Sequence, residues 1–211
     1  MRKIKGFAVS SFCVLILMSL ILIGVTSASY RPEIIGGKVF NQYWNGTEEK
    51  NDSVLAQAGD IKITTSKVKY LKELNGAFGV EKSEMEIISQ LILEELLLKE
   101  AEKVGVVISD EEVRRYMDEV RANMPNDKVG YDTFMLFIRN SGWTEDEYWI
   151  KSFPVYKKAY TIGKFRNFYL KEQFESLNPM LKTSEINVAF DIFYEEYTNN
   201  LLNKVEIQYA E

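Results

Sequence analysis

With 211 residues, the chain is long enough for one well-buried domain and an export segment, and its 46% hydrophobic and 27% charged residues exclude intrinsic disorder. It has no histidine, and its single cysteine, Cys13, lies in an N-terminal apolar run, which excludes an internal disulfide and a histidine-dependent catalytic triad. The formal net charge is −5, and no basic cluster interleaved with aromatic residues offsets it, so we expect no nucleic-acid partner.

The first 28 residues have the pattern of a signal peptide or a signal anchor. Three basic residues precede residues 7–25, which are mostly apolar and carry no charge. That run is long enough to span a bilayer as a helix, yet the small residues after it suit signal peptidase, with cleavage after Ala28 as one option. We favour cleavage because serines dilute the run, but a retained segment 7–25 would anchor the protein in the membrane. In both cases residues 29–211 lie outside the cytoplasm, in the cell envelope or secreted.

Residues 29–52 separate this segment from the predicted folded module. They contain Pro32, a pair of glycines at Gly36 and Gly37, and polar residues with no sustained hydrophobic period. Such a stretch predicts a flexible tether, so the folded module is expected over residues 53–211.

Two short β-prone runs, residues 54–58 and 61–64, open the module. Gly59 and Asp60 between them suit a tight turn, which predicts a small hairpin. A short helix is expected directly after it, over residues 66–74.

Longer amphipathic helices follow. Residues 84–104 carry an apolar arc too wide for a surface helix, which predicts the central helix of the core, and Gly105 ends it. Ser109 begins the next helix, and Glu112, three residues later, completes a capping box. Apolar residues at i, i+3, i+4, i+7 and i+11 then give residues 109–124 one clean apolar face.

Similar signals for the start and the end of a helix recur further along the chain. After a short loop, residues 131–140 are expected to form a helix that Gly142 stops. Thr144 opens another capped helical segment, which can run to about residue 174. Pro154 interrupts it, and because proline removes a backbone hydrogen bond, we predict a kink or two abutting helices.

The last helix is predicted to begin at Ser184, and residues 205–209 alternate apolar and polar side chains as a final strand. A strand needs a partner for its backbone groups, and the hairpin at residues 54–64 is the only other candidate. We therefore expect the two ends of the module to meet in one small sheet within a mainly α fold.

Four stretches of the sequence together resemble a known family. They are residues 54–64 (VLAQAGDIKIT), 90–105 (QLILEELLLKEAEKVG), 107–113 (VISDEEV) and 141–148 (SGWTEDEY). In this order and spacing, the chain resembles the N-terminal chaperone module of the SurA and PrsA proteins, over residues 53–175 and more loosely 184–209. The resemblance implies a mainly α, SurA-N-like fold with a small sheet built from the N-terminal hairpin and the C-terminal strand.

The resemblance also implies a function. In that family the module is a chaperone for unfolded exported chains, and a parvulin-type prolyl isomerase domain is commonly inserted before the last helix. Here only residues 176–183 occupy that position, and the chain lacks the histidines of parvulin sites. We therefore expect a chaperone outside the cytoplasm that is not an enzyme and binds unfolded or extended polypeptide segments. The alternatives are a membrane-tethered envelope scaffold with one specific partner and, less favoured, a prolyl isomerase.

Aromatic and methionine side chains concentrate in the middle of the module. A groove left open beside residues 109–124 would let them capture peptides, since a flexible thioether adapts to varied partners, but packing into the core is the commoner outcome at helical spacing. The candidates are Tyr116, Met117, Val120, Met124, Phe134, Phe137, Trp143 and Trp149. Acidic residues gather in the first helical turns, where they complement the helix dipole, and no phosphate-binding glycine motif is present. We expect no metal and no cofactor.

Overall fold

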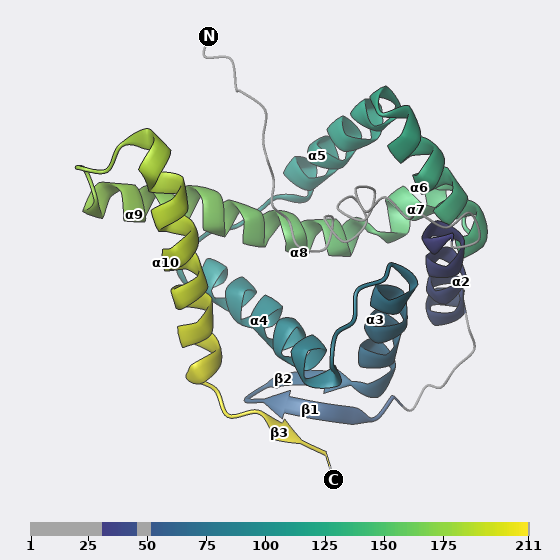
Figure 1. Cartoon of the computed structure of the whole chain (residues 1–211), viewed down its shortest axis with the longest axis horizontal. Helices are drawn as coiled ribbons and strands as arrows, with labels where there is room; N and C mark the ends of the chain where they lie inside the picture. The colour runs from purple at the N-terminus through teal and green to yellow at the C-terminus, as the bar shows by residue number, and fades with distance from the viewer. Residues whose placement is uncertain (1–30, 46–51, 211) are drawn as a thin grey trace.

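Figure 1 shows the computed structural model of the chain, in which residues 31–45 and 52–210 are described. Helices dominate it, and one three-stranded sheet lies near the C-terminus. The mainly α fold with a small sheet is therefore confirmed. The export segment expected over residues 1–28 lies outside the described residues. Among those that are described, no helix is both long and apolar enough to span a membrane.

The sheet joins the two ends of the folded module. β1 (Val54–Ala58) and β2 (Ile61–Thr64) form the predicted antiparallel hairpin, and Gly59 in its turn has a φ of 60°, which glycine adopts without strain. β3 (Gln208–Tyr209) pairs antiparallel with β1, so the strand order is β2-β1-β3. The ends meet as expected, although the last strand is shorter than its sequence pattern predicts.

Two helices follow the hairpin. α3 (Thr65–Ala77) continues directly from β2, and α4 (Glu84–Lys103) begins at a capping box formed by Ser83 and Glu86. Gly105, with a φ of 75°, follows the end of α4, as predicted. α4 is the central helix, and one buried cluster links it to the hairpin and α3: Ala56, Ala58, Ile61, Ile63, Val68, Ile87, Ile88, Leu91 and Ile92.

The other half of the module consists of α5 (Asp110–Asn123), a 3₁₀ turn (Met124–Asn126), α6 (Lys128–Ser141), α7 (Glu145–Lys151) and α8 (Phe153–Lys164). The capping boxes predicted at Ser109 and Thr144 are both present, at the start of α5 and of α7. Pro154 lies in the first turn of α8, where its missing N–H has no helical partner to lose. The helical segment therefore breaks into two abutting helices, as expected.

The C-terminal part forms an arm that returns to the sheet. A π-helical segment (Phe165–Leu170) continues α8 into α9 (Lys171–Leu177), and α10 (Thr183–Asn203) then runs back towards β3 (Figure 1). Another buried cluster packs this arm against α4: Leu97, Ala101, Phe165, Leu170, Phe190 and Leu201.

The prediction of a flexible tether over residues 29–52 is wrong for its central part, which is a helix, α2 (Pro32–Asn45). The two glycines that suggested a loop are buried packing residues. A Cβ atom on Gly37 would lie 2.5 Å from the carbonyl oxygen of Phe137 in α6, and one on Gly36 would lie 2.7 Å from the ring of Phe78. Tertiary packing thus stabilises a helix whose intrinsic propensity is low.

Candidate functional site

The candidate groove residues chosen from the sequence lie in the core. Five of the eight are buried: Met117, Phe134, Phe137, Trp143 and Trp149. Tyr116, Val120 and Met124 are partly buried against the same cluster, and Tyr116 stacks on Tyr160 of α8 with ring centroids 4.8 Å apart. Packing in the core thus engages most of these side chains, because α8 contacts both α5 and α7, and α2 lies along α6.

A small cavity does lie beside α5, facing α7 and α8. Its volume is about 360 Å³, and Met117 and Trp149 form part of its wall. Its rim is charged: Arg121 is 3.1 Å from Glu145 and 2.6 Å from Asp146. The hydrogen bond to Asp146 raises the pKa of the Arg121 guanidinium. A rim of paired charges does not suit an apolar polypeptide segment, because a segment that entered the cavity would remove water from the charged side chains at a cost in free energy.

A different cavity, also of about 360 Å³, lies where α2, α3 and α4 face α7 and α8. We call it the apolar pocket. Its volume falls at the small end of the range of roughly 300–1,000 Å³ for ligand pockets, which suits a few side chains of a polypeptide. Its lining comes from these helices and the residues next to α7: Phe40, Tyr43, Trp44, Lys67, Tyr70, Leu71, Leu74, Gln90, Leu91, Glu94, Trp143, Tyr148, Lys151, Ser152, Pro154, Val155, Tyr156 and Lys158. Trp143 is the one sequence candidate among them.

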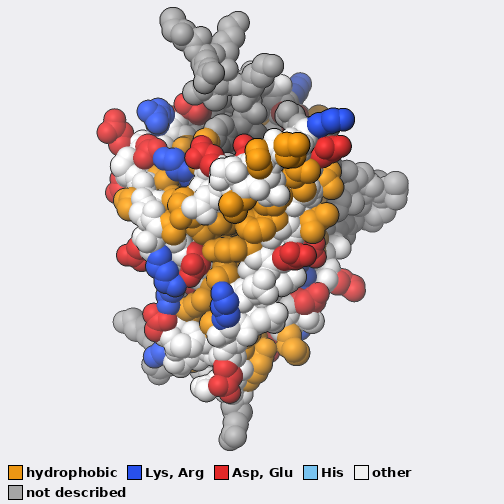
Figure 2. Space-filling model, turned by 90° about the vertical axis from the view of Figure 1, so that its left-hand side faces the viewer, with side chains coloured by type: hydrophobic (Ala, Val, Ile, Leu, Met, Phe, Trp, Pro, Cys, Tyr) orange, Lys and Arg blue, Asp and Glu red, His pale blue; other side chains and the backbone are white. Residues whose placement is uncertain are grey.

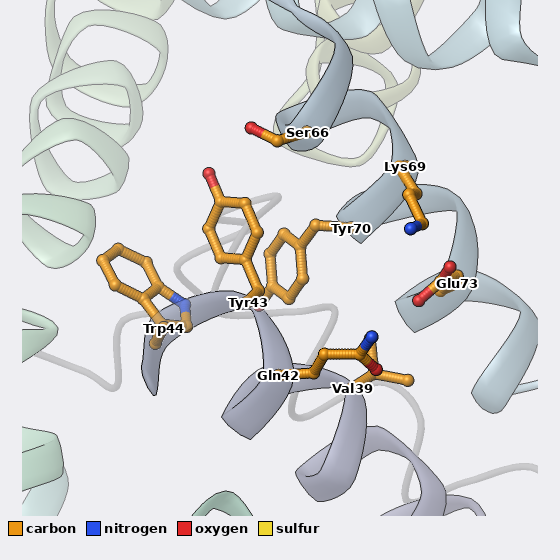
Figure 3. Close-up of a pocket in the computed structure, with 8 residues that line it drawn as sticks. All are labelled: Val39, Gln42, Tyr43, Trp44, Ser66, Lys69, Tyr70 and Glu73. Carbon is orange, nitrogen blue, oxygen red and sulfur yellow. The ribbon is translucent and has the colours of Figure 1, made fainter. Parts of the chain in front are cut away.

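Two stacked tyrosines separate the apolar pocket from a smaller, more polar one. The rings of Tyr43 in α2 and Tyr70 in α3 have centroids 4.2 Å apart, and Figure 3 shows them side by side between the two helices. The smaller cavity, of about 290 Å³, is bordered by Ser66, Lys69 and Glu73 of α3. The tyrosine pair therefore presents aromatic surface to the apolar pocket and separates it from Ser66, Lys69 and Glu73.

Hydrogen bonds hold Trp143 in the wall of the apolar pocket. Its indole Nε1 donates to Oδ1 of Asn45, 2.9 Å away, and Nδ2 of Asn45 donates to the carbonyl oxygen of Ser141 at 3.1 Å. Its ring also packs edge-on against Phe40, with centroids 4.7 Å apart. These contacts tie the end of α2 to the turn before α7, so the wall is formed before any ligand arrives.

The inner wall of the pocket contains two tyrosines that stay neutral. Burial raises the pKa of Tyr156 to about 12 and raises the pKa of Tyr148 well above its ordinary value. The inner wall therefore contributes hydroxyl groups but no charge at neutral pH. The charged groups of the lining are the lysines and Glu94.

Comparison with known proteins identifies the family. The family model described as the SurA-like N-terminal domain matches residues 1–150, which is well over half of the chain. The chain belongs to the SurA-like N-terminal domain family. The match ends within α7, so α8 and the arm lie beyond the matched residues. No curated protein and no solved structure matches the chain.

The SurA-like family is associated with chaperone-like function, and its domain is a non-catalytic module. SurA-like domains generally bind unfolded polypeptides, outside the cytoplasm. Within residues 31–45 and 52–210 of this SurA-like chain, no group of three or more His, Cys, Asp or Glu side chains is placed to hold a metal ion.

The aromatic residues of α2 are among the pocket residues that the sequence-based candidates did not include. Phe40, Tyr43 and Trp44 all line the apolar pocket, yet they fell in the predicted tether. The sequence did contain a signal for this helix, because the spacing of these three residues, i, i+3 and i+4, places them on one helical face. Pro32 at the first helical position and Glu33 in the first turn also suit a helix start.

The SurA-like chain also exposes apolar side chains on its arm. Figure 2 shows the face on which α9 and α10 lie, and a band of hydrophobic side chains crosses it. Leu177 and Met180, at the turn between α9 and α10, are 80% and 93% exposed, and Val188 and Ile192 of α10 are exposed as well. None of the three cavities described above involves these residues, so the apolar pocket is the better-defined candidate site.

Proposed function

We propose that the protein is an exported, non-catalytic chaperone that holds apolar segments of unfolded polypeptides in the apolar pocket. The observation that carries this proposal is the pocket itself, an open cavity lined by aromatic rings that are fixed in place by packing and hydrogen bonds. The family supports the same function, since SurA-like domains generally bind unfolded polypeptides.

The size of the pocket predicts weak and reversible binding. A few apolar side chains can enter, each contributing about 1.5–3 kcal/mol when fully buried. Ordering a flexible peptide offsets much of that gain. We expect micromolar dissociation constants, which correspond to about −8 kcal/mol at 1 μM, and little dependence on exact sequence.

A pair of matched variants tests whether the pocket is the site. Val155 lines the pocket in the first turn of α8, and Val129 lies outside it in the first turn of α6; they are 39% and 70% exposed. Replacing either by aspartate places a carboxylate in a similar helical position. We expect Val155→Asp to lose affinity for an unfolded client by about tenfold or more, because the new charge must be desolvated by an apolar ligand. Val129→Asp should bind like the wild type.

Aggregation of several unrelated unfolded clients gives the readout, with the melting temperature of each variant measured alongside. The wild type and Val129→Asp should suppress aggregation of all clients, and Val155→Asp should not. Protection of no client would indicate a scaffold with one specific partner. Equal protection by all three proteins at equal melting temperature would show that the pocket is not the site.

We also propose that the protein is exported, with residues 29–211 outside the cytoplasm. The basic residues before segment 7–25 would hold the N-terminus inside. Protease added to intact spheroplasts should digest the protein, and protection until the membrane is lysed would refute this topology. The mass of the mature chain would show whether the segment is cleaved.

A further inference from the structure

We infer that the apolar pocket prefers polypeptide segments in which the inserted apolar side chain is flanked by acidic residues, and that Lys67, Lys151 and Lys158 create this preference. This inference rests on the proposed function, because it concerns which polypeptides the same pocket accepts.

The charge of the pocket lining differs from that of the chain as a whole. Three lysines line the pocket against one carboxylate, that of Glu94, whereas the chain carries a net charge of −5. The lysines come from α3, α7 and α8, on both sides of the apolar centre. The lining of the two other cavities is balanced: Lys69 with Glu73 in one, and Arg114 and Arg121 with Asp118 and Asp146 in the other.

Lys67 is the lysine most available to a ligand. It is half-buried at the pocket, and among the described residues its ammonium group has no ion-pair or hydrogen-bond partner. Partial burial weakens the screening of its charge by water. A ligand carboxylate beside Lys67 would therefore be attracted more strongly than a carboxylate beside a fully exposed lysine.

The other two lysines are partly engaged. The ammonium of Lys151 lies 4.4 Å from the ring centroid of Trp143 and 3.7 Å from Glu147, which is a long distance for an ion pair. Lys158 pairs more closely with Glu95, at 2.5 Å. Neither Glu95 nor Glu147 lines the pocket, so among the lining side chains three ammonium groups face a ligand together with the single carboxylate of Glu94. The two pairs reduce the charge that Lys151 and Lys158 offer, and Lys67 keeps its full charge. We expect Lys67 to contribute most and Lys158 least.

These contacts add to apolar binding without replacing it. Ion pairs near a surface change affinity only a few-fold each and weaken as salt rises. Three lysines together should favour an acidic flank over a neutral one by about threefold to tenfold at low ionic strength.

The test uses the full mature chain and three fluorescent peptides with blocked termini. All share one apolar core, and the residues flanking it are glutamate, glutamine or lysine. The wild type should bind the glutamate peptide about threefold to tenfold more tightly than the glutamine peptide, with the lysine peptide weakest. The difference should largely vanish at 1 M salt, where the Debye length is about 3 Å.

Two lysine variants locate the effect. Lys67→Gln should lower affinity for the glutamate peptide by about 1.5- to 5-fold and leave affinity for the glutamine peptide unchanged. Lys62→Gln, at an exposed lysine of β2 outside the pocket, should bind all three peptides like the wild type.

The outcomes separate this inference from the proposed function. If the wild type binds all three peptides equally and Val155→Asp binds none of them, the pocket is a polypeptide site without charge preference, and this inference is wrong. Equal loss of both peptides in Lys67→Gln would also contradict it, since the lysine would then act through its apolar stem. Absence of binding for every peptide would overturn the proposed function as well.

Discussion

The polar side chains of the apolar pocket differ in burial and in charge. Tyr148 and Tyr156 are enclosed, and burial raises the pKa of both hydroxyls, so they remain neutral. Lys151 and Lys158 lie at the rim, with side chains 44% and 48% exposed, so their ammonium groups remain hydrated. An apolar side chain entering the pocket therefore meets neutral walls, while its polar neighbours in the client meet the charged rim.

The raised pKa of Tyr156 predicts a loss of stability at alkaline pH. In the unfolded chain a tyrosine ionises near pH 10, whereas in the folded protein Tyr156 stays protonated until about pH 12. The unfolded state thus binds fewer protons between these values, so the stability that is fully present below pH 10 is lost as pH rises towards 12. This residue alone should account for roughly 1 kcal/mol of lost stability by pH 11.

Urea unfolding at pH 8 and pH 11 measures this effect. Other groups titrate in the same range, so the informative comparison is with Tyr156→Phe, which should lose less stability between the two pH values than the wild type. Tyr209→Phe, at a tyrosine that is 47% exposed, serves as the control and should behave like the wild type. An identical pH dependence in all three proteins would contradict the burial of Tyr156.

Among the secondary-structure elements, α2 supplies the most aromatic side chains to the pocket lining, three in all. Its position depends on the close approach to α6 at Gly37. Gly37→Ala should therefore destabilise the protein by about 1–3 kcal/mol, because the new methyl group meets the carbonyl oxygen of Phe137. Gly76→Ala in α3 meets no atom within 4 Å and should be neutral or stabilising by up to about 1 kcal/mol.

Denaturant unfolding and client binding should be measured for both glycine variants. Gly37→Ala should also weaken client binding, since moving α2 moves Phe40, Tyr43 and Trp44. Equal stability of the two variants would indicate that α2 is not packed against α6 as described.

Sequence reasoning placed most helix boundaries correctly because they depend on local interactions. The capping boxes at Ser109 and Thr144 and the stop at Gly142 involve residues within a few positions of one another. α2 was not predicted because its two glycines suggested a loop, whereas tertiary contacts explain them: Gly37 packs against α6 and Gly36 against Phe78. The pocket was not predicted for the same reason, since spacing places Phe40, Tyr43 and Trp44 on one helical face but does not show what that face packs against.

At the scale of the whole molecule, β3 joins the C-terminal end of the module to the N-terminal hairpin. Val205 and Ile207, just before β3, pack partly buried against the cluster formed by the hairpin and α4. Removing residues 203–211 should therefore lower the melting temperature markedly. Burying these two side chains, which is only partial, contributes at most about 1.5–3 kcal/mol each to a total free energy of unfolding of about 5–15 kcal/mol.

Thermal unfolding of the truncated protein checks this prediction. Tyr209→Ser, which keeps the backbone pairing and changes an exposed side chain, should melt close to the wild type. A truncated protein that melts like the full chain would show that the two ends do not stabilise each other.

Site-specific photo-crosslinking to an unfolded client tests the central claim most directly. A photoreactive residue is placed in turn at Val155 in the apolar pocket, at Val129 on α6 and at Ile192 on the exposed face of α10. We predict strong crosslinking from position 155, which an excess of apolar peptide abolishes, and little from position 129. Crosslinking from position 192 with none from position 155 would contradict the account and place the client on the arm instead.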